Sequence, residues 1–206
     1  MELPLYLDGP KDEFLISSVR KADNDLLRRF REYKERRAKE GVVVHLPHDD
    51  TVQEDPIGLY VCIQNKNALQ DASRVSMFLD PTSSGSVVDF GMTFMAGKTL
   101  TIVDIVNGER MDDFSEFIKD YADGTNGLSD RALSNPFYGE LQTFKERVTY
   151  ASEVHFPFDD DKLGLAKFGM VFMSGKPFVL ENVADVSLTD VKSYQNVARA
   201  LHDLYR

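Results

Sequence analysis

The residues best suited to chemistry lie at positions 80–98, in the stretch DPTSSGSVVDFGMTFMAGK. Hydroxyl groups and a glycine make up residues 82–86, and Asp89 follows inside an otherwise apolar run. Hydroxyls and backbone amides at the start of a helix can face an anion. On spacing alone, Asp89 is explained most simply as a carboxylate that complements the helix dipole. The stretch predicts a phosphate-sized loop followed by a helix that carries one carboxylate.

Two strands are expected to flank this helix. Residues 74–80 (RVSMFLD) are β-prone, and Asp80 and Pro81 close them, which is typical of a buried parallel strand. The helix ends at Gly97, and residues 99–106 (TLTIVDIV) follow as the next strand. Ligands of such a strand–helix–strand unit gather beyond the carboxyl ends of its strands, so the loop before the helix is the expected site.

The spacing of glycines around Asp89 resembles the signature of the nucleoside 2-deoxyribosyltransferase-like family. The residues that carry the resemblance are Gly85, Asp89, Gly91, Gly97 and Lys98. That family has a glutamate nucleophile at the place of Asp89. The N-terminal segment LYLDGP, residues 5–10, resembles the family's first motif, with Tyr6 at the position of the tyrosine that orients the nucleophile. The similarity covers roughly the first half of the chain.

The resemblance implies an enzyme that cleaves the N-glycosidic bond of a nucleoside or nucleotide. A carboxylate attacks C1′ of the sugar and expels the base. Asp89 would be the nucleophile, Tyr6 would orient it, and Asp8 and Gly9 would lie where the backbone approaches the ligand closely. No cofactor is implied.

Departures from the family pattern bear on the substrate. Ser83 stands where the transferases have an aspartate, and Ser73 aligns with a second aspartate near the start of the preceding strand. The related deoxynucleoside monophosphate N-glycosidases place a serine at the Ser83 position to hold the 5′-phosphate. Ser83, Ser84 and Gly85 therefore favour a nucleotide. Asp8, Asp80 or the loop at His48 could deliver the proton that the leaving base needs.

Aspartate in place of glutamate withdraws the carboxylate by ~1 Å, and a misplacement of that size can cost about 10²-fold in rate. This shorter side chain defines a second hypothesis, a nucleotide-binding or sensing module that keeps the pocket without efficient catalysis. A structural or interaction protein is a third class.

The amino-acid composition indicates which classes of partner the protein binds. The 206 residues include 34 acidic and 24 basic side chains, a formal charge of −10, which argues against binding a nucleic acid polymer. The basic residues between positions 28 and 39 alternate with acidic ones, as on a solvated amphipathic helix. No long apolar segment or signal-like start is present, so we expect a cytosolic protein that does not bind membranes.

Two further motifs favour structural roles. The single cysteine, Cys62, lies in the apolar run LYVCI and is expected in the core. His45 and His48 have a spacing that suggests a metal site, but on a strand they would point to opposite faces. We therefore expect no metal.

The pattern along the chain predicts an α/β protein with a largely parallel, Rossmann-like or flavodoxin-like sheet flanked by helices. The expected strands, besides those around Asp89, are residues 3–7, 42–47 and 57–63, and the expected helices are residues 23–40, 67–73, 111–121 and 190–205. A Gly-, Asn- and Ser-rich run at residues 123–136 marks a boundary, at which Leu128 and Leu133 are expected to pack on the core. Residues 1–123 would form the core and residues 124–206 the rest of the same globule.

A repeat crosses this boundary. FGMTFMAGK at residues 90–98 returns as FGMVFMSGK at residues 168–176, each after a strand-like segment and an acidic turn. The second copy has Lys167 at the place of Asp89, and Pro157 demotes its first strand towards an edge. We therefore expect the second copy to be structural.

The two repeated helices carry more Phe and Met than one helix face requires, which leaves apolar surface to be covered. The resemblance implies homo-oligomers, and we expect a homodimer. In a competing arrangement the second helix covers the first within one chain.

Overall fold

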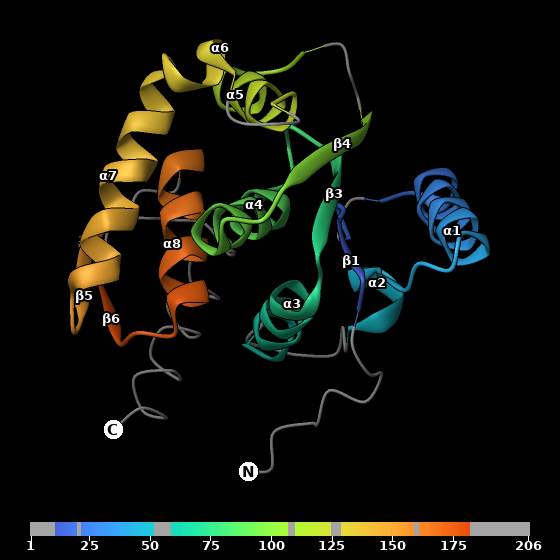
Figure 1. Cartoon of the computed structure of the whole chain (residues 1–206), viewed down its shortest axis with the longest axis horizontal. Helices are drawn as coiled ribbons and strands as arrows, with labels where there is room; N and C mark the ends of the chain where they lie inside the picture. The colour runs from blue at the N-terminus through green and yellow to red at the C-terminus, as the bar shows by residue number, and fades with distance from the viewer. Residues whose placement is uncertain are drawn as a thin grey trace.

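The computed structural model describes residues 11–19, 22–51, 59–106, 110–124, 129–158 and 161–181. At its centre is a four-stranded sheet in the order β2-β1-β3-β4, and every pair in it is parallel. The strands are β1 (Glu13–Ile16), β2 (Val44–His45), β3 (Arg74–Leu79) and β4 (Leu100–Ile105). Because they are parallel, their carboxyl ends share one edge of the sheet (Figure 1). The predicted α/β class with a parallel sheet is thus confirmed.

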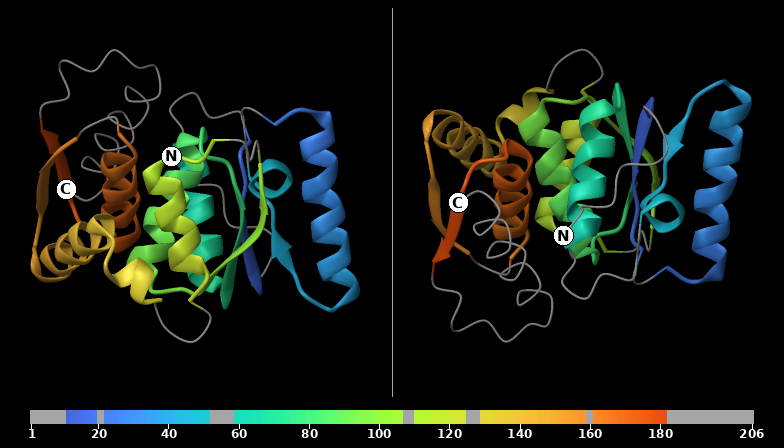
Figure 2. Two further views of the ribbon diagram at one scale, coloured as in Figure 1. Left: turned by 90° about the horizontal axis from the view of Figure 1, so that it is seen from above. Right: turned by 90° about the horizontal axis from the view of Figure 1, so that it is seen from below.

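Helices cover both faces of this sheet (Figures 1 and 2). Helix α1 (Asn24–Lys39) packs Leu26, Phe30 and Tyr33 on one face, and the Asp23 carboxylate accepts from the Leu26 amide (2.8 Å) to start the helix. The other face carries α3 (Leu59–Asp71), α4 (Ser84–Ala96) and α5 (Asp113–Ala122). A short helix, α2 (Pro47–Asp50), follows β2.

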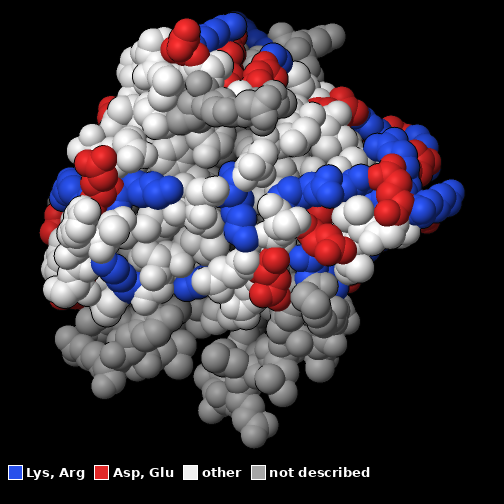
Figure 3. Space-filling model, in the orientation of Figure 1, with Lys and Arg blue, Asp and Glu red and all other residues white. Residues whose placement is uncertain are grey.

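The basic cluster on α1 is a solvated surface in the structure. Arg28 pairs with Asp25 (2.5 Å) and with Glu32 (2.6 Å) along the helix. Arg31 reaches Asp49 (2.9 Å) on α2. Figure 3 shows the basic and acidic side chains intermixed on this side of the molecule. Surface pairs of this kind contribute little stability, and they leave no uniform basic patch here for a nucleic acid.

The repeat forms a second strand–helix–strand unit. Its strands β5 (Val154–Pro157) and β6 (Phe178–Glu181) pair in parallel, and α8 (Lys162–Ser174) connects them. Two helices, α6 (Asp130–Leu133) and α7 (Pro136–Tyr150), lead into this unit. Helix α8 lies between α4 and α7, so the two repeated helices are sandwiched between the two sheets (Figure 2).

Matching residues of the two repeats make reciprocal contacts. A Cβ at Gly91 would lie 2.0 Å from the Ala166 carbonyl oxygen, and one at Gly169 would lie 2.1 Å from that of Val88. Glycine is therefore required on both helices for the backbones to approach this closely. Lys66 on α3 donates to the carbonyl of Phe172 (3.1 Å). In the same way, Lys145 on α7 donates to that of Phe94 (2.8 Å). The repeats thus pack as a twofold-like pair within one chain.

Several expectations about elements are wrong. Residues 57–63 were expected as a strand, but residues 59–71 form the single helix α3, because a short apolar run fits a buried helix equally well. Cys62 on it is half-buried. Residues 47–50 form α2, so the strand expected at residues 42–47 is only Val44–His45. Leu133 is 46% exposed, and Ala132 beside it is buried instead.

Other parts of the chain were missed or lie outside the described ranges. The sequence patterns did not predict β1 or α7. The predicted strand at residues 3–7, Leu128 and the predicted helix at residues 190–205 lie outside the residues that the structure describes. In the described part of the chain, no helix is long and apolar enough to cross a membrane.

Candidate functional site

Two neighbouring strands end side by side at the carboxyl edge of the sheet. Strand β1 runs into Ser17 and Ser18, and β3 runs into the turn before α4. Both serines are buried, with 4% and 2% of their surface exposed, and neither hydroxyl has a hydrogen-bond partner within the described ranges. A buried hydroxyl without a partner costs free energy, about 1 to 3 kcal/mol. These two groups are therefore suited to contacting a ligand.

The turn between β3 and α4 is fixed by its own side chains. The Asp80 carboxylate accepts from the Thr82 amide (2.9 Å) and hydroxyl (2.8 Å). Ser83 caps the helix and accepts from the amide (3.3 Å) and hydroxyl (2.9 Å) of Ser86. Asp80 therefore holds the turn, whereas the hydroxyl hydrogen of Ser83 donates to no acceptor in the part of the chain described.

The start of α4 is open for an anion. Ser84 is half-buried, Gly85 is exposed, and a Cβ at Gly85 would meet no atom within 4 Å. The first amides of a helix have no partner inside the helix, and they carry its positive dipole end. The sequence correctly placed Ser83, Ser84 and Gly85 at such a helix start, next to Asp80.

Asp89 lies one turn further along α4 and is buried, with 6% of its surface exposed. Asn65 on α3 donates its side-chain amide to Asp89 Oδ1 (3.3 Å). Burial raises the pKa of Asp89 to about 7, and the Asn65 hydrogen bond opposes the rise only in part. Near neutral pH this carboxyl group is therefore ionised in part of the molecules and protonated in the rest.

Further buried polar groups lie behind Asn65. The Thr51 hydroxyl donates to Asn65 Oδ1 (3.1 Å), and His45 Nε2 lies 3.1 Å from the same hydroxyl. The His45 ring stacks on Phe14 of β1, with their ring centres 5.4 Å apart. Burial lowers the pKa of His45 to about 4, so its ring is neutral at pH 7.

One expected site residue, Ser73, is not brought together with Asp89. Ser73 lies at the amino end of β3, where its hydroxyl donates to the Asp12 carbonyl (3.0 Å). That is the opposite edge of the sheet, so Ser73 does not belong to the site. Tyr6, Asp8 and Gly9 lie outside the described residues. In the structure, the strand beside β3 on that side is β1, which ends in Ser17 and Ser18.

The second repeat contributes one side chain to the turn. Lys162, at the start of α8, donates to the carbonyl of Pro81 and pairs with Asp112. It also lies 3.2 Å from the Ser115 hydroxyl. A cation on the carbonyl side of this turn stabilises the conformation that presents Ser83.

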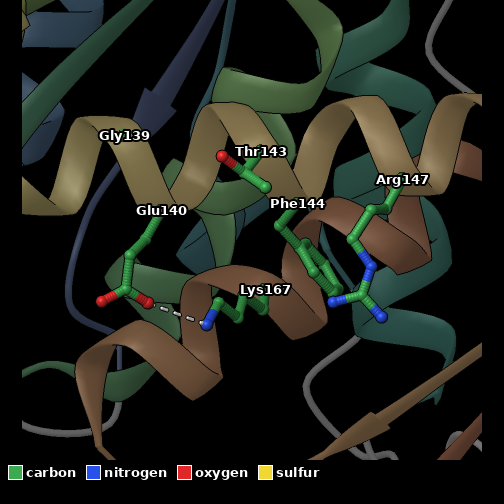
Figure 4. A pocket seen from close by; sticks show the side chains of 6 residues that line it. All are labelled: Gly139, Glu140, Thr143, Phe144, Arg147 and Lys167. Atoms are coloured by element: carbon green, nitrogen blue, oxygen red, sulfur yellow. Dashed lines mark hydrogen bonds and ion pairs between the residues drawn. The ribbon is translucent and has the colours of Figure 1, made fainter.

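The equivalent place in the second repeat holds different chemistry. Lys167, which replaces Asp89, faces Glu140 of α7 (3.2 Å) in a pocket between α7 and α8 (Figure 4). Phe144 lies where the first repeat has Asn65, and the Lys167 ammonium is 5.8 Å from the centre of its ring. The carboxylate that lines this pocket, Glu140, pairs with a lysine instead of with an amide.

Five polar residues near this part of the sheet were not predicted from the sequence, because they come from segments far from Asp89 in the chain. They are Ser17, Ser18, His45, Thr51 and Asn65. Two consecutive serines directly after the apolar residues FLI (14–16) were the available signal for the first pair. His48 lies away from this group and pairs with Asp49 (2.8 Å). Among the residues that the structure describes, no three His, Cys, Asp or Glu side chains gather in a way that could hold a metal ion.

Comparisons with protein-family models, with curated proteins and with solved structures find no match to this chain. The resemblance to the nucleoside 2-deoxyribosyltransferase-like family therefore rests on two sequence motifs, the one around Asp89 and the one at residues 5–10, and it stays a prediction.

Proposed function

We propose that this chain cleaves the bond between base and sugar in a nucleotide or nucleoside, with Asp89 as the nucleophile. The observation that supports this most is the buried Asp89 carboxylate, which Asn65 holds close to an open helix start. A pKa of about 7 leaves a large fraction of Asp89 ionised at neutral pH.

In the proposed reaction, an Asp89 oxygen attacks C1′ of the sugar. The C1′–N bond breaks, its electron pair stays on the base nitrogen, and the base takes up a proton. Water, or a second base, then attacks C1′ and releases the Asp89 carboxylate from the sugar. An apolar setting favours the attack on C1′, because the oxocarbenium-like centre meets an anion that is poorly solvated by water.

Several groups support a 5′-phosphate on the substrate. The start of α4 and the Ser83 hydroxyl present donors, and the Ser17 and Ser18 hydroxyls are buried at the adjoining strand end. Hydroxyls and amides replace the carboxylates that would repel a phosphate. We therefore propose a nucleoside monophosphate as the preferred substrate. The cytosolic location expected from the sequence is part of this proposal.

One observation favours a second candidate, a nucleotide-binding or sensing module. The Asp80 carboxylate is used within its turn, and no other described carboxylate lies near Asp89 to protonate the leaving base. A protein with this arrangement could bind a nucleotide and turn it over slowly or not at all.

A panel of nucleosides and nucleoside monophosphates distinguishes the two candidates. Base release is followed by chromatography, and ligand-induced stabilisation by thermal shift. The proposed enzyme releases base from at least one monophosphate, whereas the binder is stabilised without base release. If no member of the panel stabilises the protein and none releases base, both candidate functions are contradicted.

The Ser83→Ala protein tests the phosphate role. We expect a roughly 10-fold higher KM for the monophosphate, with little change for the matching nucleoside, because a hydrogen bond to a charged group is lost. Equal effects on both substrates would contradict a role of Ser83 in binding phosphate.

A further inference from the structure

Four buried polar side chains from four segments form a continuous chain. It runs from His45 at the end of β2, through Thr51 after α2 and Asn65 on α3, to Asp89 on α4. The three links measure 3.1, 3.1 and 3.3 Å. His45, Thr51, Asn65 and Asp89 have between 1% and 6% of their surface exposed.

The donors in this chain all point the same way. Thr51 has one hydroxyl hydrogen, which it gives to Asn65 Oδ1. The Thr51 oxygen must then accept from His45 Nε2, so the His45 ring carries its proton on Nε2. With its oxygen engaged by Thr51, Asn65 turns its NH₂ group towards Asp89.

The opposite orientation of the Asn65 amide is unfavourable. A flipped amide would place its carbonyl oxygen against the Asp89 carboxylate and its NH₂ group against the Thr51 hydroxyl. Two acceptors would then face each other in a buried site. Because the His45 ring is stacked on Phe14 and stays neutral at pH 7, it keeps donating in the same direction.

We propose that Asn65 is the positioning residue for Asp89, and that His45 and Thr51 fix which way round the Asn65 amide stands. The proposal rests on the proposed function, in which Asp89 is the nucleophile. An uncharged donor holds one Asp89 oxygen without forming an ion pair, so the carboxylate keeps its direction and remains available for attack.

In the described part of the protein, we can name the groups that set the pKa values of the two titratable members of this hydrogen-bonded chain, Asp89 and His45. Burial and the Asn65 amide set the pKa of Asp89. The charged groups that act on His45 are Asp50, Lys11 and Lys34. Asp50, which pairs with Lys34 (2.6 Å), raises the pKa of His45, and Lys11 and Lys34 lower it.

Thr51→Val is the sharpest test, because it keeps the shape of the side chain and removes the link. We expect kcat for base release to fall on the order of 10- to 100-fold with KM within about twofold, since the nucleophile is misdirected and substrate contacts stay. We also expect the pKa of Asp89 to rise further above its value of about 7, because the Asn65 amide, a donor to the charged form, loses its fixed orientation.

That pKa is measured without turnover. Unfolding free energies are compared over pH between each protein and the same protein carrying Asp89→Asn. Thr93→Val is the matched control: Thr93 is also buried, and its hydroxyl donates to the backbone carbonyl of Asp89 (2.8 Å) instead of to the chain. Thr51→Ser, which restores a hydroxyl, should return both kcat and the pKa towards the starting values.

A second variant, His45→Phe, keeps a ring on Phe14 and removes the donor, so it should shift the pKa in the same direction. An unchanged Asp89 pKa in both Thr51→Val and His45→Phe would overturn the proposal. An equal shift in Thr93→Val would also overturn it, because general loosening would then explain the effect. A shifted pKa in a protein that releases no base would support the chain while contradicting the proposed function.

Discussion

At the scale of single residues, the burial of Asp89, the proposed nucleophile, has a cost in stability. Its pKa is about 7 in the folded protein, against an ordinary value of 3.8. The folded state therefore holds a proton that the unfolded chain releases as the pH rises from about 4 to about 7. Stability is lost across this window, and the loss is complete above pH 7.

Asp89→Asn should remove this loss. At pH 8 we expect the free energy of unfolding to increase by up to about 4 kcal/mol, because the ionised form is no longer buried. At pH 4 the two proteins should be equally stable, since Asp89 is then protonated in the folded state. Urea unfolding at pH 4, 6 and 8 measures both values. A difference that does not change with pH would show that Asp89 titrates normally.

Local sequence was sufficient for some site residues and insufficient for others. Asp80, Ser83 and Asp89 were predicted because a strand end, a helix cap and a helical carboxylate lie within one short stretch. Asn65, Thr51 and His45 were not, because only packing brings α2, α3 and β2 to Asp89. Ser73 was assigned by alignment, and it lies at the wrong end of β3.

At the scale of elements, the contact between α4 and α8 depends on two glycines. We expect Gly91→Ala or Gly169→Ala to destabilise the protein by roughly 3 kcal/mol or to prevent folding, because each Cβ would overlap a backbone carbonyl oxygen. Thermal and urea unfolding measure the loss.

Gly139 on α7 provides the matched control, since a Cβ there would meet no atom within 4 Å. Gly139→Ala should stabilise the protein by about 1 kcal/mol, as alanine does in a helix interior. A Gly91→Ala protein as stable as Gly139→Ala would contradict the close approach of α4 and α8.

Helices and strands were predicted correctly where turn or capping residues mark their ends. Asp80 and Pro81 mark the end of β3, and Gly97, with a φ of 66°, ends α4 in the left-handed conformation. No glycine or proline separates residues 57–63 from residues 64–71, so their apolar run did not distinguish a strand from α3. Strand order, and with it the position of Ser17 and Ser18, depends on long-range pairing that local patterns do not encode.

At the scale of the whole molecule, the two repeats share one interface. The sequence predicted the repeat, and the structure has its two helices covering each other within the chain. This contact covers apolar surface of both α4 and α8. The homodimer remains a prediction, and it requires a surface other than the contact between these two helices.

Light scattering of the purified protein at micromolar concentration tests the assembly. The homodimer prediction requires twice the chain mass of 23.3 kDa. A monodisperse species at the mass of a single chain would contradict the dimer. That result would favour the competing arrangement, in which the two repeats pair within one chain in place of a dimer.

The central claim, that ionised Asp89 attacks the sugar, is tested most directly by the rate of base release over pH. The substrate is the most active nucleoside monophosphate, and the proteins are the unaltered chain and Asp89→Asn. We expect kcat/KM to rise with pH through about 7, as Asp89 loses its proton, and we expect Asp89→Asn to lose at least about 10³-fold in kcat. Undiminished base release by Asp89→Asn, or a rate that falls as the pH rises through 7, would contradict Asp89 as the nucleophile.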